Sequence, residues 1–226
     1  MTTIISGNLG VLGGTPRTTV NDAAYQIADS DNVVAMTAIS AARIMTLPAA
    51  SSYPVGRLLT IVDESGSVTA TNKISLAPTG AAKIDGSNTT QEIINVPRGR
   101  CVVYTNGTDW FLIEVSVIYL STFSGVPLPG SYGNIATTAQ GTVGKWRVCV
   151  TFTATNGTGA SNCSTRIYDG TTAYQSSNLR LENTGFTCGG ALAPRVVASP
   201  AGSLAFQAIN PSLGSVSGDL VSERVI

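Results

Sequence analysis

Residues 57–115 read RLLTIVDESGSVTATNKISLAPTGAAKIDGSNTTQEIINVPRGRCVVYTNGTDWFLIEV, and they carry the clearest strand signals of the chain. Short apolar runs rich in β-branched residues alternate there with clusters of Gly, Asn, Asp, Ser and Pro. This spacing is typical of antiparallel sandwiches and barrels, because the turn residues end each strand early. We therefore expect strands at the apolar runs 58–62, 74–76, 93–96, 101–104 and 110–113.

Turn chemistry accounts for the polar residues between these runs. Asn106-Gly107 lies between two apolar runs and predicts a tight hairpin, because both residue types tolerate positive φ. The segment 63–66, Asp-Glu-Ser-Gly, is likewise interpreted as a turn. Its two adjacent carboxylates would point to opposite faces of a strand, so they cannot act as a catalytic pair.

Outside this stretch, the sequence predicts four segments. They are an N-terminal arm (1–19), a first β-module (20–115), a connector (116–131) and a second β-module (132–226). The arm is Gly-rich and has no apolar core of its own, so we expect it to gain order by lying on a partner. The connector breaks the alternation and carries Gly125, Pro127 and Pro129.

The second module shows the same strand signals. An alternating run at 146–152 predicts a strong strand, and Asp169-Gly170 predicts another hairpin. Further strands are expected at 179–182, 195–198, 203–206 and 220–226. The predicted fold class is all-β: two antiparallel β-sandwich or jelly-roll modules with an extended N-terminal arm.

Charge is scarce in this chain. Its 226 residues include 13 basic and 13 acidic side chains, and 12% are charged, about half the usual share. We expect a surface that is rich in Ser, Thr and Asn and partly buried against partners. Nucleic acid is not an expected partner, since phosphate binding needs clustered Lys and Arg. The two close basic pairs, Arg98/Arg100 and Lys145/Arg147, are each expected on one strand face.

The chain has no histidine, which excludes His-based triads and His metal sites. Its four cysteines lack the CxxC spacing of a zinc or redox site. We expect Cys101 and Cys149 to be buried as small hydrophobes, whereas the pattern leaves open whether Cys163 and Cys188 form a disulfide. We expect no catalytic, cofactor-binding or metal-binding residue, and no cofactor.

The first module resembles a small β-module that recurs in tailed-bacteriophage virion proteins: tail fibres, head fibres and capsid decoration proteins. The matching pieces are residues 46–50 (TLPAA), 56–67 (GRLLTIVDESGS), Asp85-Gly86 and 104–113, and the similar region covers about a third of the chain. These are scaffold motifs. The resemblance therefore implies a location in the virion, assembled in the host cytoplasm, and brings no catalytic residues with it.

We accordingly expect a non-enzymatic virion structural protein, a capsid decoration (cement) protein or head fibre. It would be a homotrimer that docks through its N-terminal arm on the major capsid protein or another virion protein. The alternative is a receptor-binding tail-fibre tip that recognises a host surface glycan. No membrane segment is expected. Aromatic side chains that would suit a sugar site are Tyr53, Tyr104, Trp110, Trp146 and Tyr168, although Trp110 and Trp146 sit among apolar neighbours, which favours the core.

Overall fold

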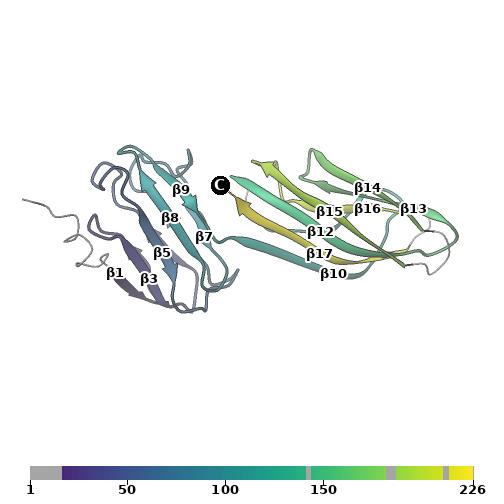
Figure 1. The fold of residues 1–226 in the computed structure, drawn as a ribbon, viewed down its shortest axis with the longest axis horizontal. Coiled ribbons are helices and arrows are strands. Elements are labelled where there is room, and N and C mark those ends of the chain that lie inside the picture. The colour runs from purple at the N-terminus through teal and green to yellow at the C-terminus, as the bar shows by residue number, and fades with distance from the viewer. Residues whose placement is uncertain (1–16, 141–143, 182–186, 211–213, 226) are drawn as a thin grey trace, which may run out of the picture. The chain divides into compact units, whose positions relative to one another are not determined.

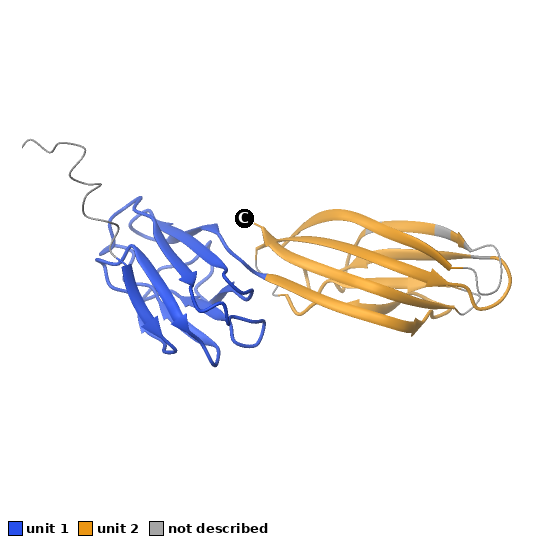
Figure 2. Cartoon of the chain, turned by 60° about the horizontal axis from the view of Figure 1, so that its bottom comes forward, with its two compact units in different colours: residues 1–117 blue, residues 118–226 orange. Residues whose placement is uncertain are grey.

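The computed structural model describes residues 17–140, 144–181, 187–210 and 214–225. Its regular structure there consists of strands alone, β1 to β17, so the all-β prediction is confirmed. The chain divides into two compact units, Met1–Val117 and Ile118–Ile226 (Figures 1 and 2).

The first unit holds two sheets, of order β1-β3-β5-β8-β9 and β2-β4-β6-β7. The first sheet is built from β1 (Arg17–Asn21), β3 (Val33–Ala38), β5 (Leu59–Asp63), β8 (Arg100–Thr105) and β9 (Trp110–Glu114). The second is built from β2 (Tyr25–Gln26), β4 (Arg43–Thr46), β6 (Ile74–Ala77) and β7 (Gln91–Ile94). Every strand expected in 57–115 is present, with ends shifted by one or two residues.

The pairing inside the first unit differs from the expected antiparallel arrangement. β1, β3 and β5 pair in parallel, and so do β2, β4 and β6. From β1 to β6, successive strands alternate between the two sheets. The chain therefore winds back and forth between two layers as a β-solenoid does. Antiparallel pairs form only where β6 meets β7 and where β8 meets its neighbours β5 and β9. Local turn signals reveal strand ends but not this winding.

A continuous apolar core lies between the two sheets of the first unit. Met36, Met45 and Trp110 are fully buried in it, and the ring of Tyr53 lies 5.1 Å from that of Trp110. The hairpin at Asn106-Gly107 is confirmed as a four-residue loop between Thr105 and Trp110. Gly107 alone takes positive φ there, while the Asn106 carboxamide accepts the N–H groups of Thr108 and Asp109.

The predicted N-terminal arm needs a shorter boundary. Residues 1–16 lie outside the described residues, but Arg17 to Thr19 already belong to β1. Val20, next in the same strand, is 5% exposed and packs in the core of the first unit. Strand pairing with β3 therefore anchors the chain from Arg17 onward.

The second unit is an eight-stranded antiparallel sandwich. Its sheets have the order β10-β17-β12-β15 and β11-β16-β13-β14. The first sheet is built from β10 (Ile118–Pro127), β12 (Lys145–Thr155), β15 (Thr187–Ala198) and β17 (Ser215–Val225). The second is built from β11 (Gly133–Thr137), β13 (Ser161–Tyr168), β14 (Ala173–Leu181) and β16 (Ala205–Ile209).

These pairings wind the second unit as a jelly roll. β10 pairs with β17, β11 with β16, β12 with β15, and β13 with β14. The unit is thus one long hairpin rolled into two sheets, the jelly-roll form of the predicted module. The hairpin at Asp169-Gly170 is present, with positive φ at Gly170. Three stacked or tilted rings, Phe123, Phe152 and Phe206, meet in the core between the sheets.

The predicted connector is wrong for most of its length. Residues Ile118–Pro127 form β10 and pair along β17, close to the C-terminus. Gly125 and Pro127 do not end the strand: the register shifts between Phe123 and Val126, where Gly125 takes positive φ. A bulge of this kind admits an irregular residue without ending the strand. The strand was hidden because its partner lies about a hundred residues away in sequence.

Candidate ligand-binding surface

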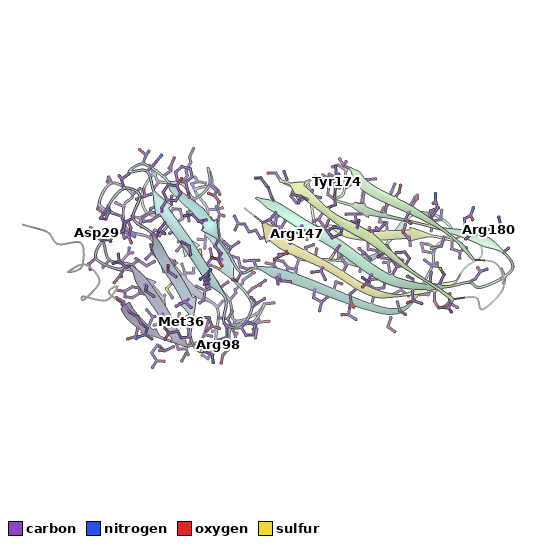
Figure 3. The ribbon with its side chains drawn as sticks, in the orientation of Figure 1. Asp29, Met36, Arg98, Arg147, Tyr174 and Arg180 are labelled. Carbon is purple, nitrogen blue, oxygen red and sulfur yellow. The ribbon has the colours of Figure 1, made fainter. Side chains whose placement is uncertain are left out.

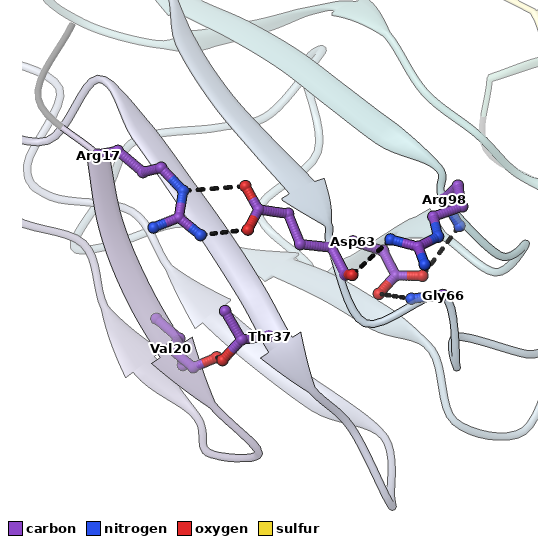
Figure 4. Close-up of polar contacts among 7 residues, drawn as sticks. Arg17, Val20, Thr37, Asp63, Gly66 and Arg98 are labelled. Atoms are coloured by element: carbon purple, nitrogen blue, oxygen red, sulfur yellow. Dashed lines mark hydrogen bonds and ion pairs between the residues drawn. The ribbon is translucent and has the colours of Figure 1, made fainter. Parts of the chain in front are cut away.

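Among the described residues, three carboxylates are buried, and each holds a turn through hydrogen bonds. Asp63 is 1% exposed; one of its oxygens accepts the Ser65 hydroxyl (2.5 Å) and the Gly66 N–H (3.1 Å), and the other accepts the Arg98 N–H (3.0 Å). Figure 4 shows the Asp63 contacts with Gly66 and Arg98 beside the ion pair of Arg17 with Glu64. The turn interpretation of 63–66 is confirmed, although Asp63 itself ends β5.

Asp31 holds the entry to β3 in the same way. Its carboxylate accepts the Thr18 hydroxyl (2.6 Å), the Tyr25 hydroxyl (3.0 Å) and the Ala28 N–H (2.8 Å). Figure 3 shows Asp29, two residues before Asp31, and Arg98, which is bound to Asp63, far apart in the first unit. These carboxylates therefore serve separate turns rather than one site.

Asp169 holds the β13–β14 turn of the second unit and is 2% exposed. It accepts the Tyr174 hydroxyl (2.6 Å) and the N–H groups of Thr171 (2.9 Å), Thr172 (2.7 Å) and Ala201 (3.0 Å). Burial alone would raise the pKa of Asp169, but these hydrogen bonds outweigh burial and hold that pKa well below its ordinary value. Tyr174 lies near one end of β14, with Arg180 near the other (Figure 3).

The cysteines are free thiols. Cys101 and Cys163 are fully buried, and burial raises the pKa of the Cys163 thiol to about 11. Cys149 is only partly buried, on the outer side of β12, which differs from the expected core position. Cys163 and Cys188 lie on strands of different sheets, β13 and β15. Within the described residues, no group of three or more Cys, Asp or Glu side chains is placed to hold a metal ion.

The aromatic residues named from the sequence separate into core and surface. Tyr53, Trp110 and Trp146 are at most 3% exposed and belong to the cores. Tyr104 stacks on Phe111 across β8 and β9, with ring centroids 5.3 Å apart. Tyr168 lies on the outer face of the second jelly-roll sheet, where the guanidinium of Arg166 packs against its ring.

That outer face carries a polar row across neighbouring strands. Asn134 of β11 lies opposite Gln207 of β16, which lies opposite Arg166 of β13. Cys163, Thr165 and Ile167 are buried, so the alternation of β13 turns Arg166 and Tyr168 outward. The Arg166 Nε donates to Gln207 Oε1 (2.7 Å), and Gln207 Nε2 donates to Asn134 Oδ1 (2.7 Å).

Two tyrosine rings complete this surface, which we call the arginine platform (Tyr132, Asn134, Arg166, Tyr168 and Gln207). The guanidinium carbon of Arg166 lies 4.0 Å from the ring centroid of Tyr132 and 4.9 Å from that of Tyr168. Tyr132 remains 38% exposed. An exposed ring, amides and a fixed guanidinium are the groups that protein sites use to orient polar ligands.

The outer face of the other jelly-roll sheet carries a group of apolar side chains beside charged ones. Leu120 lies opposite Val221, which lies opposite Cys149, and Arg147 separates Glu223 from Val196 in the next row. Leu120 is 64% exposed and Val196 is 50% exposed. We call this the apolar face, made of Ile118, Leu120, Cys149, Val196 and Val221. Lys145 and Arg147 are both exposed on this side of β12, as expected, whereas Arg98 lies in a turn with φ of 60° and not on a strand face.

Sequence reasoning missed the arginine platform and most of the apolar face. The Arg-x-Tyr spacing at 166–168 was a usable signal, since alternation puts both side chains on one side of a strand. Tyr132, Asn134 and Gln207 reach the platform only through pairings between distant strands. The apolar face was obscured because β10 was interpreted as a connector.

Comparisons with known proteins add little to this picture. No family model and no curated protein matches the chain. Among solved structures, the chain is similar to an uncharacterized protein of Listeria monocytogenes EGD-e, crystallised with α- and β-D-glucose, magnesium and calcium. The identity is 10% and the TM-score 0.21; the match covers 76% of this chain and 19% of the Listeria chain, so the likeness carries no argument. Among the described residues there is no helix long and apolar enough to cross a membrane.

Proposed function

We propose that the chain is a non-enzymatic structural protein of a tailed-phage virion, a capsid decoration (cement) protein or head fibre that decorates or braces the particle. It acts as a homotrimer and docks on the major capsid protein or another virion protein through its N-terminal segment. The resemblance of residues 33–113 to phage β-modules supports the virion setting. A jelly roll is an architecture that viral capsid proteins use, which is compatible with this role.

The observation that carries the structural role is the apolar face. Exposed apolar side chains that gather on one face of a soluble protein favour a contact surface, and these lie on a regular four-stranded sheet. The ion pair between Arg147 and Glu223, with 3.2 Å between Nη1 and Oε2, crosses the same face. Because this pair holds one charge of each sign, it adds no net charge to the face.

The chemistry of the carboxylates supports a non-enzymatic role. A general acid or base must be free to exchange a proton with a substrate. Asp31, Asp63 and Asp169 are instead buried and saturated by hydrogen bonds that fix turns. Asp22 is similarly engaged: hydrogen bonds from Ser40, with the Arg43 ion pair, lower its pKa to about 2.

The experiment that tests this role is the copy number of the chain in purified particles of the phage that encodes it. Electrophoresis with densitometry compares its band with that of the major capsid protein. On the order of hundreds of copies, a multiple set by capsid symmetry, is the expected result. A few to a few dozen copies per particle would assign the chain to a fibre instead, and absence from particles would end the virion proposal.

The arginine platform favours one second candidate, a receptor-binding tail-fibre tip that recognises a host surface glycan. Sugars present hydroxyl groups around apolar ring faces, so their sites combine exposed aromatic rings with amide and charged side chains. Tyr132, Arg166 and Asn134 supply these groups on one sheet face. Copy number separates this candidate from the decoration role.

A further inference from the structure

We propose that the arginine platform binds the carboxylate of an acidic sugar, with Arg166 as its anchoring cation. This inference rests on the glycan-binding candidate and goes further, because it names the charged group of the ligand and the residue that takes it. It holds for a decoration protein as well as for a fibre tip, since either can contact a cell surface.

The orientation of Arg166 is fixed before any ligand arrives. Its Nε donates to Gln207, which is 7% exposed and is held in turn by Asn134. The rings of Tyr132 and Tyr168 lie against the guanidinium plane within 5 Å. A flexible arginine loses much side-chain entropy on binding, and this restraint removes part of that cost.

Among the described residues, Arg166 also forms no ion pair with an acidic side chain. Five other basic residues of the described chain form ion pairs with Asp or Glu, namely Arg17, Arg43, Lys73, Arg100 and Arg147. In contrast, every residue that fixes Arg166 is neutral: Gln207, Tyr132 and Tyr168. Among the described residues, no acceptor is assigned to its Nη1 or Nη2 atoms. The N–H groups at that end of the guanidinium are therefore available to an anion.

The geometry of the free end suits a carboxylate. Two parallel N–H groups, one on each Nη atom, match the two oxygens of a carboxylate in a bidentate pair. A single cation suits a singly charged ligand, whereas polyphosphates and nucleic acids require clustered basic residues. The exposed ring of Tyr132 offers an apolar surface to a pyranose, and Ser176 and Asn134, in the same cross-strand row, offer polar groups to its hydroxyls.

The test compares two sugars that differ in one group. Methyl β-D-glucuronide carries a carboxylate where methyl β-D-glucoside carries a hydroxymethyl group. Isothermal titration or NMR titration of the full chain should give a Kd on the order of 1 mM for the glucuronide, a strength typical of a weak single-site ligand. We expect binding of the glucoside to be at least about tenfold weaker, the equivalent of one charge-assisted hydrogen bond. Sialic acid, measured in parallel, identifies which source of carboxylate the platform prefers.

Variants of the platform assign the effect to Arg166. Arg166→Gln should weaken glucuronide binding by about tenfold or more, and Arg166→Lys by less, because lysine keeps the charge but not the two-pronged donor. Arg195→Gln is the matched control, because Arg195 is exposed on β15 of the other sheet. This variant should bind the glucuronide as tightly as the native protein does. Circular dichroism verifies that each variant is folded.

Three results would overturn the proposal. Equal affinity for glucoside and glucuronide would show that the platform does not recognise the carboxylate, and it would leave the glycan-binding candidate unaffected. Equal loss in Arg166→Gln and Arg195→Gln would show unspecific attraction by charge. Failure of all sugars to bind at 20-fold above the expected Kd, on the order of 20 mM, would reject both the inference and the glycan-binding candidate.

Discussion

The carboxylate of Asp63 accepts the backbone N–H of Arg98 at 3.0 Å, which joins two turns that lie 35 positions apart in sequence. Arg98 has φ of 60°, a conformation that is costly for a non-glycine residue. Its guanidinium returns to donate to the Glu64 carbonyl (2.6 Å). The two turns thus hold each other, and the strain at Arg98 is offset by a buried charged acceptor.

Asp63→Ala should therefore destabilise the first unit by about 2–3 kcal/mol, since a hydrogen bond to a charged group contributes about 1.5–3 kcal/mol. Chemical denaturation followed by Trp fluorescence measures this loss, with Trp110 reporting on the first unit. The matched control is Glu64→Ala, which removes an exposed ion pair and should change little. Equal effects of the two substitutions would show that the hydrogen bonds of Asp63 contribute no more to stability than the exposed ion pair of Glu64.

Gly218→Ala should destabilise the second unit. A Cβ at this position of β17 would stand 2.1 Å from the Thr151 carbonyl oxygen and 2.7 Å from the Phe152 Cα. Both atoms are backbone, so β12 and β17 would have to separate, and overpacking of this kind costs about 1–3 kcal/mol. Gly189→Ala on β15 meets no atom within 4 Å and should be neutral or slightly stabilising. Calorimetry that shows the same midpoint for both variants would contradict this account of the β12–β17 contact.

Acid should weaken the second unit through Asp169. The pKa of its carboxyl is lowered in the folded state from an ordinary value of 3.8, so the unfolded chain binds the proton first as the pH falls. The stabilisation is complete above about pH 4 and is lost below it, with a slope of up to about 1.4 kcal/mol per pH unit. Asp169→Asn should lower stability at pH 7 and flatten this dependence between pH 4 and pH 2, as measured by urea unfolding. A variant with an unchanged acid slope would exclude Asp169 as its source.

The strands were predictable because their signals are local. The alternation at 146–152 and the Asn106-Gly107 turn depend on residues that are neighbours in sequence. Pairing partners were not predictable, since parallel and antiparallel arrangements of the first unit would give similar apolar runs. β10 was missed for the same reason: its pairing partner β17 lies about a hundred residues further along the chain.

The candidate surface was harder to predict than the fold. Arg166 donates its hydrogen bond to Gln207 at a separation of 41 residues, and Gln207 donates to Asn134 across 73. Each is an ordinary polar residue of an antiparallel strand when viewed alone. Only the register of three strands turns them into one network, and a slip of one residue in any of them would break it.

The segment 1–16 is expected to attach the protein to its particle. Deletion of residues 1–16 should abolish binding to particles that lack the chain, while both units stay folded, because β1 begins at Arg17. Deletion of residues 1–21 is the informative comparison: it removes β1 and the buried Val20, so the first unit should also lose stability. Sedimentation of mixtures of protein and particles measures binding. Saturation of particles by the shorter deletion would refute attachment through this segment.

Homotrimerisation through the apolar face is the last prediction, and it follows from the exposed apolar side chains on that face. An obligate interface between copies buries about 2,000 Å² or more in total and is enriched in apolar side chains. Among the described residues of the second unit, Leu120 and Val196 are the most exposed large apolar side chains. Leu120→Asp should leave the fold intact, because the side chain faces out of the sheet, but should place an unpaired charge inside the interface and dissociate the trimer.

Val55→Asp provides the control, since Val55 is 69% exposed in the first unit and lies outside the apolar face. Light scattering at micromolar concentration and below should report three times the 23.2 kDa chain mass for the native protein and for Val55→Asp, and a single chain mass for Leu120→Asp. The threefold number comes from the resemblance to phage fibres, because closed symmetry alone would equally accept a dimer. A stable native monomer would refute self-association altogether. A dimer that Leu120→Asp dissociates would keep the apolar face as the interface and refute threefold symmetry alone.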